Sequence, residues 1–463
     1  MNSRLNRRTF LAGSVLAGSS LAIGFHSSAA AAESTSTLEK LNLAAIGTAN
    51  QAGGNIRNVA TENIVALADV DQNMLDRAGA TYPGSRTYRD WRVMLEQEED
   101  HIDAVLVGTP DHTHAPASAM AMRMKKHLFC EKPLTNTVYE SRVLTDLARE
   151  HNLVTQLGTN IHAGDNYRRV VELVQGGAIG EVREAHVWVN VHYTGRHLIT
   201  GNPAPRHLDW DLWLGPTVDR PYCESVADDG QVIPIHPKNW RSFWDYGTGG
   251  LGDFGCHYVD LVFWALKLAH STSISATGPT PHVSSATCDL VVKYEFPARD
   301  ELPPVDVTWY DGDQRPEILA SLRRQDGSPL EWRNGQLFVG SEGMLIADYS
   351  RHMLLPVDQF ADFERPDPSI ATSIGHHQKW VHAIKTNGPT TCSFDYSGPL
   401  TEAVLLGVAS YRSGASIEWD AENLHVTNSP HAQQFIHRDT VMGGRCRSSD
   451  PLSPSGARAT CAD

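Results

Sequence analysis

The fold of this chain is decided by residues 41–47, which read LNLAAIG. This short apolar run ends at a glycine, as a buried strand does before a tight turn. Four more such runs follow, at residues 64–68, 102–107, 127–130 and 154–157. Helical spacing fills the gaps between the runs, so the sequence predicts a parallel, doubly wound α/β sheet.

The ligand of such a sheet binds beyond the carboxyl ends of its strands. The residues that end the five runs are therefore the first candidates for a functional site. They are Gly47, Asp69, Thr109, Pro110, Glu131, Lys132, Pro133, Gly158, Thr159 and Asn160.

From about residue 161 the pattern changes to strand-like runs without a helix between them. These runs lie at residues 182–192, 289–296, 305–310 and 335–347. They predict an α+β domain over residues 161–440, built on a large and mainly antiparallel open sheet, after a first domain at residues 41–160. Residues 441–463 are rich in Ser, Arg, Gly and Pro and are expected to form a disordered tail.

The first 32 residues have the features of an export signal. A basic segment, NRRTFL at residues 6–11, precedes a mildly apolar run at residues 12–25 and four alanines at residues 29–32. The run is too short for a membrane span. The paired arginines indicate the twin-arginine route, and an ordinary secretion signal is the alternative. We therefore expect a periplasmic or extracellular protein with a polar linker at residues 33–40.

Composition narrows the function further. The 463 residues carry a formal net charge of −15 and include 7 cysteines. The acidic balance excludes a nucleic-acid partner, which requires a basic face. No Cys-x-x-Cys pair occurs, and a protein that folds in a reducing cytoplasm before export needs no disulfides. All seven cysteines are expected to be buried or incidental thiols, and the export route is typical of proteins that already hold a cofactor.

Gly47 lies between a strand and a helix, where the pyrophosphate of a dinucleotide binds. The glycine fingerprint is incomplete, because Ala49 and Ala52 stand where glycines are expected and alanine resists positive φ. Asp69, about 20 residues further on, is placed to bind the ribose hydroxyls. Its carboxylate repels a 2′-phosphate and no arginine follows at once, so NAD is favoured over NADP. The alternative is that Asp69 caps the next helix.

Six motifs are ordered along the chain. They read ADVD at residues 68–71, TPDHTH at 109–114, CEKPL at 130–134, GAIG at 177–180, LDWDLWLGP at 208–216 and GGLGDFGCH at 249–257. Together they resemble the glucose-fructose oxidoreductase / inositol dehydrogenase (Gfo/Idh/MocA) family, most closely its exported twin-arginine members. The resemblance implies a Rossmann domain before an α+β substrate domain. It also implies an NAD(P)-dependent oxidoreductase that acts on a sugar or sugar derivative, and a homo-oligomer.

Removing a hydride from a sugar alcohol requires a group that accepts the hydroxyl proton. Asp253 and His257 are four residues apart and share one face of a helix, where the carboxylate could orient the imidazole. The alternative is a surface pair or a helix N-cap. By the resemblance, Lys132 completes the catalytic set, with His257 as the proton acceptor and Lys132 as the group that polarises the hydroxyl.

Two further sets of residues follow from the strand ends and the resemblance. Those expected at the cofactor are Gly47, Ala49, Asn50, Gln51, Asp69, Thr109, Pro110, His112, His114, Glu131, Lys132 and Gly158. Those expected at the substrate are Asn160, His162, Tyr167, Trp240, Arg241, Trp244, Asp245 and His257.

Several of these side chains have a second interpretation. His112 and His114 form a His-x-His pair, but their place at a strand end fits the nicotinamide pocket better than a metal, so no metal site is predicted. Trp210 and Trp213 suit a sugar-binding face or a packed core equally well. The pair at residues 376–377, both histidines, could line the substrate cleft or lie on the surface.

An exported enzyme has no pool of free NAD to exchange with, so we expect NAD to be tightly bound and recycled in place. Three functions are open. The first is a sugar oxidoreductase whose NAD is recycled by a second carbonyl substrate or an epimerising return step. The second is an NAD-dependent glycoside hydrolase that uses transient oxidation and elimination. The third, a catalytically silent carbohydrate-binding protein, is disfavoured by the presence of Lys132, Asp253 and His257. We favour the first.

Overall fold

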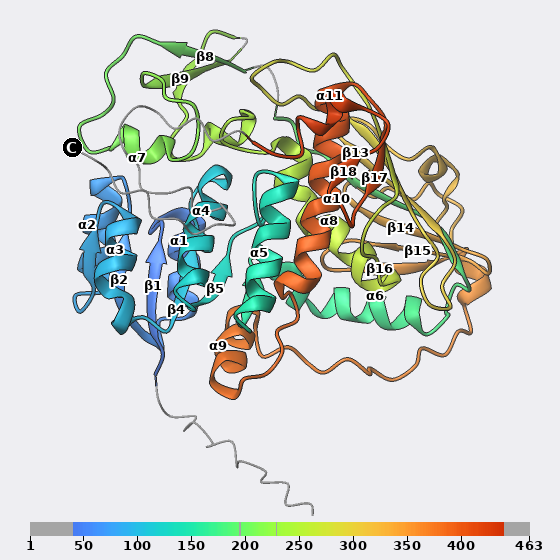
Figure 1. Cartoon of the computed structure of the whole chain (residues 1–463). Coiled ribbons are helices and arrows are strands. Elements are labelled where there is room, and N and C mark those ends of the chain that lie inside the picture. Colours follow the sequence, from blue (N-terminus) through green and yellow to red (C-terminus); the bar gives the residue numbers. More distant parts are fainter. Residues whose placement is uncertain (1–39, 194–195, 228, 439–463) are drawn as a thin grey trace, which may run out of the picture. The chain divides into compact units, whose positions relative to one another are not determined.

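The structure is a computed structural model that describes residues 40–193, 196–227 and 229–438 (Figure 1). The expected signal peptide, the linker apart from Lys40, and the expected tail at residues 441–463 lie outside these residues. The five cysteines within them are free and buried, as predicted. Among the described helices, none combines the length and apolarity needed to cross a membrane.

The N-terminal domain is built on a six-stranded parallel sheet in the order β3-β2-β1-β4-β5-β6, which confirms the predicted doubly wound topology. The strands are β1 (Asn42–Ile46), β2 (Asn63–Ala68), β3 (Arg86–Tyr88), β4 (Ala104–Val107), β5 (His127–Cys130) and β6 (Thr155–Leu157). The helices between them are α1 (Asn50–Asn58), α2 (Gln72–Thr81), α3 (Trp91–Glu98), α4 (Asp111–Arg123) and α5 (Val138–Glu150). The sequence missed β3, because this three-residue edge strand is largely exposed and has no apolar run.

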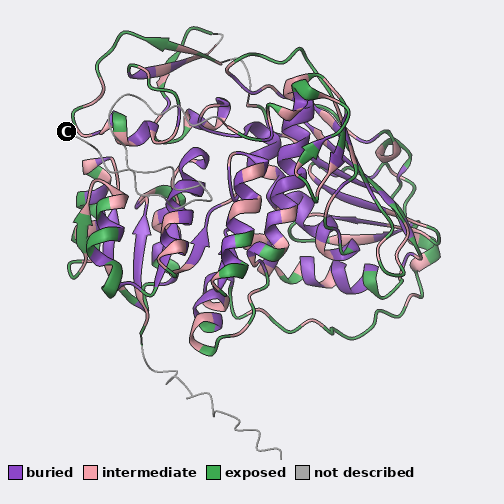
Figure 2. Ribbon diagram, viewed as in Figure 1, coloured by how far each residue is buried: buried purple, intermediate pink, exposed green. Residues whose placement is uncertain are grey.

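Both faces of this sheet are covered, which explains why its inner strands are apolar runs. Along β1, Ala44 and Ile46 pack into one core cluster while Leu43 and Ala45 pack into the other. Figure 2 shows β1 and β4 as buried and the outer faces of α2 and α3 as exposed. The first half of the chain therefore folds around side chains that alternate between the two layers of helices.

The core of this domain is completed from far along the chain. Helix α9 (His376–Thr386) places Trp380 and Val381 in the cluster that contains Leu43. Phe394 packs in the cluster that contains Ala44. The division of the chain at residue 160 stays a prediction, but the sheet of the first half uses side chains from the second half.

The C-terminal domain contains a nine-stranded sheet in the order β16-β15-β14-β7-β13-β12-β11-β17-β18. Its strands are β7 (Val182–Val189), β11 (Ser273–Thr277), β12 (Val291–Phe296), β13 (Val305–Asp311), β14 (Gly335–Gly340), β15 (Met344–Ala347), β16 (His352–Leu355), β17 (Ile417–Asp420) and β18 (His425–Val426). The sheet is mixed, because β7 pairs with β13 in parallel while the other neighbours are antiparallel. The predicted mainly antiparallel sheet is confirmed, although the run at residues 335–347 forms two strands rather than one.

Helices α6 (Asp165–Gln175), α8 (Gly249–Leu266) and α10 (Phe394–Ser413) contribute buried side chains to the main core of this domain (Figure 1). A second cluster holds Trp188 and Leu337 together with Leu322, Leu330 and Trp332. The indole N–H of Trp188 donates to the carbonyl of Trp332 at 3.0 Å. Part of the sheet surface is therefore covered by the chain itself.

A third unit, which we call the cap, is described over residues 196–227 and 229–247. It contains a three-stranded sheet of β8 (Arg196–Thr200), β9 (Cys223–Ala227) and β10 (Val232–Pro234), with helix α7 (Trp210–Leu214). Its own core is aromatic, with Trp210 stacked on Trp213 at 4.8 Å between ring centroids. Backbone hydrogen bonds from Asp209 to Val70 and from Gln72 to His207 tie the cap to the end of β2.

Candidate active site

A cavity of about 570 Å³ lies at the carboxyl ends of β1, β2, β4 and β5, beside the switch point between β1 and β4. Its walls come from the turn after β1, the strand ends, the start of α8, and the cap. This volume is in the range of small-molecule and cofactor sites. The doubly wound topology thus brings together residues that are more than 200 positions apart.

The turn after β1 shows why the incomplete glycine fingerprint is tolerated. Gly47 has φ +87°, and an added Cβ would lie 2.7 Å from the carbonyl oxygen of Gly108. Ala49 has φ −120°, so this position does not need a glycine. A Cβ on Gly108 would lie 2.6 Å from that of Ala52. The close approach of helix to strand therefore depends on Gly108 instead of a third fingerprint glycine.

Asp69 lines the cavity at the end of β2. Its Oδ2 accepts hydrogen bonds at 2.9 Å from the N–H and hydroxyl of Thr48, and its Oδ1 accepts one from the N–H of Asp71. Burial raises the pKa of Asp69, against these hydrogen bonds. Helix α2 is capped by Asp71, whose carboxylate accepts from the N–H groups of Asn73 and Met74. The alternative that Asp69 is the cap of this helix is therefore wrong.

Glu131 lines the cavity at the end of β5, and its carboxylate is hydrogen-bonded to a chain of polar side chains. Its Oε1 accepts from Asn55 Nδ2 on α1 at 2.8 Å, and Asn55 Oδ1 lies 3.0 Å from His377 Nε2 on α9. The His377 ring is stacked on Phe129 at 4.8 Å. A Cβ on Gly158 would lie 2.7 Å from Glu131 Oε1, so only glycine leaves room for this carboxylate. We call Glu131, Asn55 and His377 the relay.

Lys132 and Asp253 meet across the cavity as a buried ion pair. The ammonium of Lys132 donates to Asp253 Oδ1 and, at 2.6 Å, to the carbonyl of Asp253. Tyr193 donates to Asp253 Oδ2 at 2.8 Å, and Arg241 Nε lies 3.5 Å from the same oxygen. Burial opposes ionisation, but Lys132 and Arg241 hold the pKa of Asp253 well below its usual value. Burial likewise opposes the charge of Lys132, yet Asp253 raises the pKa of Lys132.

His257 lies one helical turn after Asp253 and lines the same cavity. Its Nδ1 has no hydrogen-bond partner among the described residues. Burial and the nearby ammonium of Lys132 lower the pKa of His257 to about 3, so the imidazole is neutral at physiological pH. The expectation that Asp253 orients this imidazole is wrong, because Asp253 bonds to Lys132 and Tyr193 instead.

Most of the residues predicted at the site line this cavity. They are Gly47, Ala49, Asn50, Gln51, Asp69, Thr109, Pro110, His114, Glu131, Lys132, Gly158, Trp240, Arg241, Asp253 and His257. The predicted residues that do not line it are His112, Asn160, His162, Tyr167, Trp244 and Asp245. Each member of the second group except Asn160 has a side chain engaged elsewhere.

His112 contacts the cap and does not line the cavity in which a nicotinamide would bind. Its ring nitrogens lie 3.2 Å from the carbonyl oxygen of Tyr246 and 2.8 Å from that of Trp213, and its ring contacts both aromatic side chains. Burial lowers the pKa of His112 to about 4, which keeps the ring neutral. The strand-end position was read correctly, but the side chain turns away from the cavity into the core.

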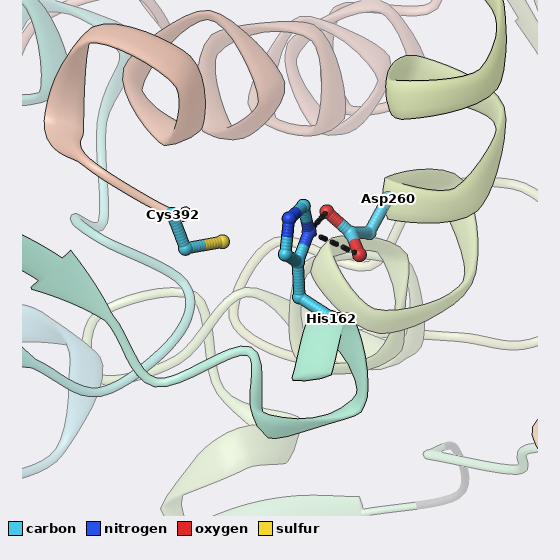
Figure 3. Close-up of side chains that lie close together, drawn as sticks. All are labelled: His162, Asp260 and Cys392. Carbon is cyan, nitrogen blue, oxygen red and sulfur yellow. Dashed lines mark hydrogen bonds and ion pairs between the residues drawn. The ribbon is translucent and has the colours of Figure 1, made fainter. Parts of the chain in front are cut away.

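His162 pairs with Asp260 of α8 instead of a substrate (Figure 3). Its Nδ1 lies 3.0 Å from both carboxylate oxygens, and its ring is stacked on Trp264 at 4.0 Å. Tyr396 donates to Asp260 Oδ1 at 2.7 Å. Cys392 lies nearby, and one donor atom from each of His162, Asp260 and Cys392 falls within 4.8 Å of the others. Because His162 and Asp260 already satisfy each other, we assign this cluster to packing, and the absence of a metal stays a prediction.

Apart from Asn160, the other predicted residues that do not line the cavity have side chains bonded to other parts of the protein. Tyr167 is buried and donates to the carbonyl of His257 at 3.1 Å. Trp244 donates to the carbonyl of His282, and Asp245 forms an ion pair with Arg220. The Nε2 of His376 lies 2.7 Å from the carbonyl oxygen of Leu157.

The lining also includes polar residues that were not singled out from the sequence, among them Thr48, Asp111, Tyr193, His236 and Lys238. Thr48 and Asp111 are neighbours of recognised strand ends, which is a usable signal. Tyr193 and the two cap residues come from segments without a regular pattern, so only the tertiary fold identifies them.

Comparison with known proteins agrees with this arrangement. Residues 41–159 match the family model "Oxidoreductase family, NAD-binding Rossmann fold", and residues 178–302 match "Oxidoreductase family, C-terminal alpha/beta domain". Together the two models span more than half of the chain.

Among curated relatives, levoglucosan dehydrogenase of Pseudarthrobacter phenanthrenivorans is 24% identical over 197 residues, which cover 42% of this chain and 40% of that protein. Myo-inositol 2-dehydrogenase of Thermotoga maritima is 26% identical over 170 residues, 37% of this chain and 46% of that protein. The chain thus spans about half or less of the length of these dehydrogenases. A glycosyl hydrolase family 109 protein of Shewanella pealeana is 29% identical over 341 residues, 69% of this chain and 62% of that protein.

Solved structures share the fold over most of the chain. GenD2 from gentamicin A biosynthesis, in complex with NAD, superposes with a TM-score of 0.55 at 18% identity, covering 83% of this chain and 97% of that one. Levoglucosan dehydrogenase in complex with NADH gives a TM-score of 0.52 at 16% identity, covering 82% and 99%. From the two family models and the site that they frame, the chain belongs to the Gfo/Idh/MocA oxidoreductase family.

Proposed function

We propose that the protein is an NAD-dependent oxidoreductase that acts on a CH–OH group of a sugar or sugar derivative, with NAD tightly bound. One observation carries this proposal. The largely buried Lys132–Asp253 pair and the neutral imidazole of His257 line the same cavity as the dinucleotide turn. A proton acceptor and a cation are therefore next to the place where a nicotinamide would receive a hydride.

The residues present fit NAD. Gly47 and Gly108 let the turn after β1, the end of β4 and helix α1 pack closely beside the cavity where a pyrophosphate would bind, and Asp69 lines the cavity where a ribose would lie. The carboxylate of Asp69 disfavours a 2′-phosphate, which supports NAD over NADP. Arg89 also lines the cavity, but its guanidinium donates to the carbonyl groups of Val70 and His207. When bound, NAD would accept the hydride of the alcohol carbon.

Lys132, Asp253 and His257, which we call the clamp, divide the proton chemistry between them. The neutral imidazole of His257 accepts the hydroxyl proton. The ammonium of Lys132 donates a hydrogen bond to the same oxygen, and Asp253 keeps Lys132 charged and in place. Trp240 and Arg241 stack on each other at 4.2 Å and offer an aromatic and polar wall to a sugar.

Tight binding is supported by the cap. His236 lines the cavity, and its Nε2 lies 3.1 Å from Asp71 Oδ2 on the first domain, while Trp213 donates to its Nδ1 at 3.1 Å. A nucleotide in the cavity would lie under these contacts. The paired arginines at residues 7–8 support twin-arginine export with the cofactor already inserted, and hence a periplasmic or extracellular location. A homo-oligomer is part of the same proposal.

The function is tested by purifying the exported protein and releasing bound nucleotide by denaturation. The folded protein is then assayed with levoglucosan, myo-inositol and glucose, and with aryl glycosides. Bound NAD together with oxidation of a free sugar supports the proposal. A protein that neither contains nor binds NAD contradicts it and leaves the carbohydrate-binding alternative.

A glycoside hydrolase that uses bound NAD transiently is the second candidate. The observation that favours it is the relative from glycosyl hydrolase family 109, whose alignment spans 69% of this chain. Release of an aglycone without net formation of NADH would select this candidate. The clamp suits both reactions, because each begins with the loss of a hydroxyl proton and a hydride.

A further inference from the structure

A carboxyl group that the clamp does not use lies in the same cavity. Asp111 is the first residue of α4, is only 3% exposed, and lines the cavity. Its Oδ2 accepts a hydrogen bond from the hydroxyl of Thr248 at 2.8 Å. Thr248 is the residue that precedes α8. Asp111 is therefore held between the first turns of two helices that meet at the site.

The hydrogen bond from Thr248 depends on a glycine in α8. A Cβ on Gly252 would lie 2.0 Å from Thr248 Oγ1. A larger residue at position 252 would push the Thr248 side chain away from Asp111. Asp111 belongs to the motif TPDHTH and Gly252 to the motif GGLGDFGCH, and Thr248 immediately precedes the second motif.

The groups that act on Asp111 come from every wall of the site. They are Asp253 on α8, Lys132 at the end of β5, Arg241 on the cap, and Tyr193, which also interacts with Asp253. Burial and Asp253 raise the pKa of Asp111 to about 7, against Arg241, the hydroxyl of Thr248 and Lys132. The imidazole of His257, by contrast, stays neutral, and Asp253 stays ionised. Asp111 is the member of this group that changes protonation near neutrality.

We propose that Asp111 is the proton-storing residue of this active site, an inference that rests on the proposed function. NAD, when bound, would take the hydride of the alcohol carbon while the electron pair of the O–H bond forms the carbonyl. The proton released from that hydroxyl would be held, after His257 has accepted it, by the carboxylate of Asp111 in the same cavity, which becomes a carboxylic acid. The reverse step returns the proton with the hydride to a carbonyl. A buried store suits an enzyme whose bound cofactor alternates between its two states.

The test uses Asp111→Asn, which keeps an oxygen for the Thr248 hydroxyl but cannot titrate. Infrared difference spectra of the purified wild-type protein should show a carboxylic acid C=O band that disappears between about pH 6 and pH 8. In Asp111→Asn the part of this band that comes from Asp111 should be missing, while the part from Asp311 remains. Sugar oxidation should fall about 10²- to 10⁴-fold, the usual contribution of a proton-transfer group, and lose its pH dependence near neutrality. In Thr248→Val the carboxyl remains but loses a hydrogen bond that lowers its pKa, so the rate inflection should move to higher pH.

Asp311→Asn is the matched control. Asp311 on β13 is also buried, burial raises its pKa to about 7, and it accepts from the N–H of Leu290, but it does not line the cavity. Its substitution should remove its own infrared band and leave the pH profile of the rate unchanged. If NAD binds and Asp111→Asn keeps the wild-type rate and profile, the inference is overturned while the proposed function stands. If no NAD binds, both are overturned.

Discussion

At the scale of single residues, the sequence predicted that Asp253 orients the imidazole of His257. In the structure the two side chains have separate roles. The spacing of Asp253 and His257 correctly placed both on one helical face, and both line the cavity. It could not show that the partner of Asp253 is Lys132, 121 positions away along the chain. Asp253 therefore holds the ammonium of Lys132, and the neutral imidazole of His257 is not hydrogen-bonded to Asp253.

This pairing predicts the effect of removing one charge. Asp253→Asn leaves the buried ammonium of Lys132 without its counter-charge, so we expect a loss of about 3–5 kcal/mol in the free energy of unfolding. Adding Lys132→Met should recover much of this loss, because it removes the uncompensated charge. Urea denaturation with an unchanged m-value measures both effects. Glu181→Gln, which breaks the exposed pair with Arg183, is the control and should change little. Equal stability of Asp253→Asn and wild type would contradict the account.

At the scale of elements, the relay links α9 to the dinucleotide site. His377→Ala removes the group beside Asn55 Oδ1 and leaves Asn55 free to turn away from Glu131. We expect NAD affinity to fall about tenfold, the effect of losing one buried hydrogen bond of about 1–1.5 kcal/mol. Calorimetric titration with NAD measures this change. His377→Gln, which can still donate, should restore most of the affinity, and His382→Ala on the exposed side of the same helix should have no effect. An unchanged NAD affinity in His377→Ala would show that the relay does not contribute to NAD binding.

The elements also show how far the sequence could be read. Apolar runs located β1, β2, β4, β5 and β6, since buried parallel strands leave an unmistakable pattern. The cap was not foreseen, because its core consists of aromatic residues in loops and short strands without a period. The packing of Trp380 against Leu43 was equally invisible, because long-range contacts leave no local signal. Strand ends therefore predicted the cofactor side of the cavity well and the substrate side only in part.

At the scale of the whole molecule, buried histidines should set the dependence of stability on pH. Burial lowers the pKa of His112 and His114 to about 4 and that of His376 to about 3. Below the usual pKa of about 6.5 the unfolded chain binds more protons than the native one, so stability rises with pH from about 4 to 6.5. Each of these residues contributes on the order of 1–3 kcal/mol over that range.

Buried carboxyl groups whose pKa is raised act in the opposite direction. Burial raises the pKa of Asp111 and Asp311 to about 7, and also raises that of Asp69 and Glu131, so the native state holds protons that the unfolded chain has lost above about pH 4. The buried histidines, which also include His257 and His377, outnumber these carboxyl groups, and we expect the midpoint of thermal unfolding to rise between pH 4 and 6.5. It should then level off or decline towards pH 8. Scanning calorimetry measures this curve, and a midpoint that falls steadily from pH 4 to 6.5 would contradict the assigned protonation states.

The central claim is that this cavity holds NAD next to a base that removes the proton of a sugar hydroxyl. The most direct measurement is the near-ultraviolet absorbance of NADH formed on the purified protein when levoglucosan, myo-inositol or glucose is added. The wild type should develop the NADH band at up to about one equivalent per chain. His257→Ala should release the same amount of NAD on denaturation but form the band at least 10²-fold more slowly. An equally fast band in His257→Ala, or a wild-type protein that binds no NAD, would contradict the account.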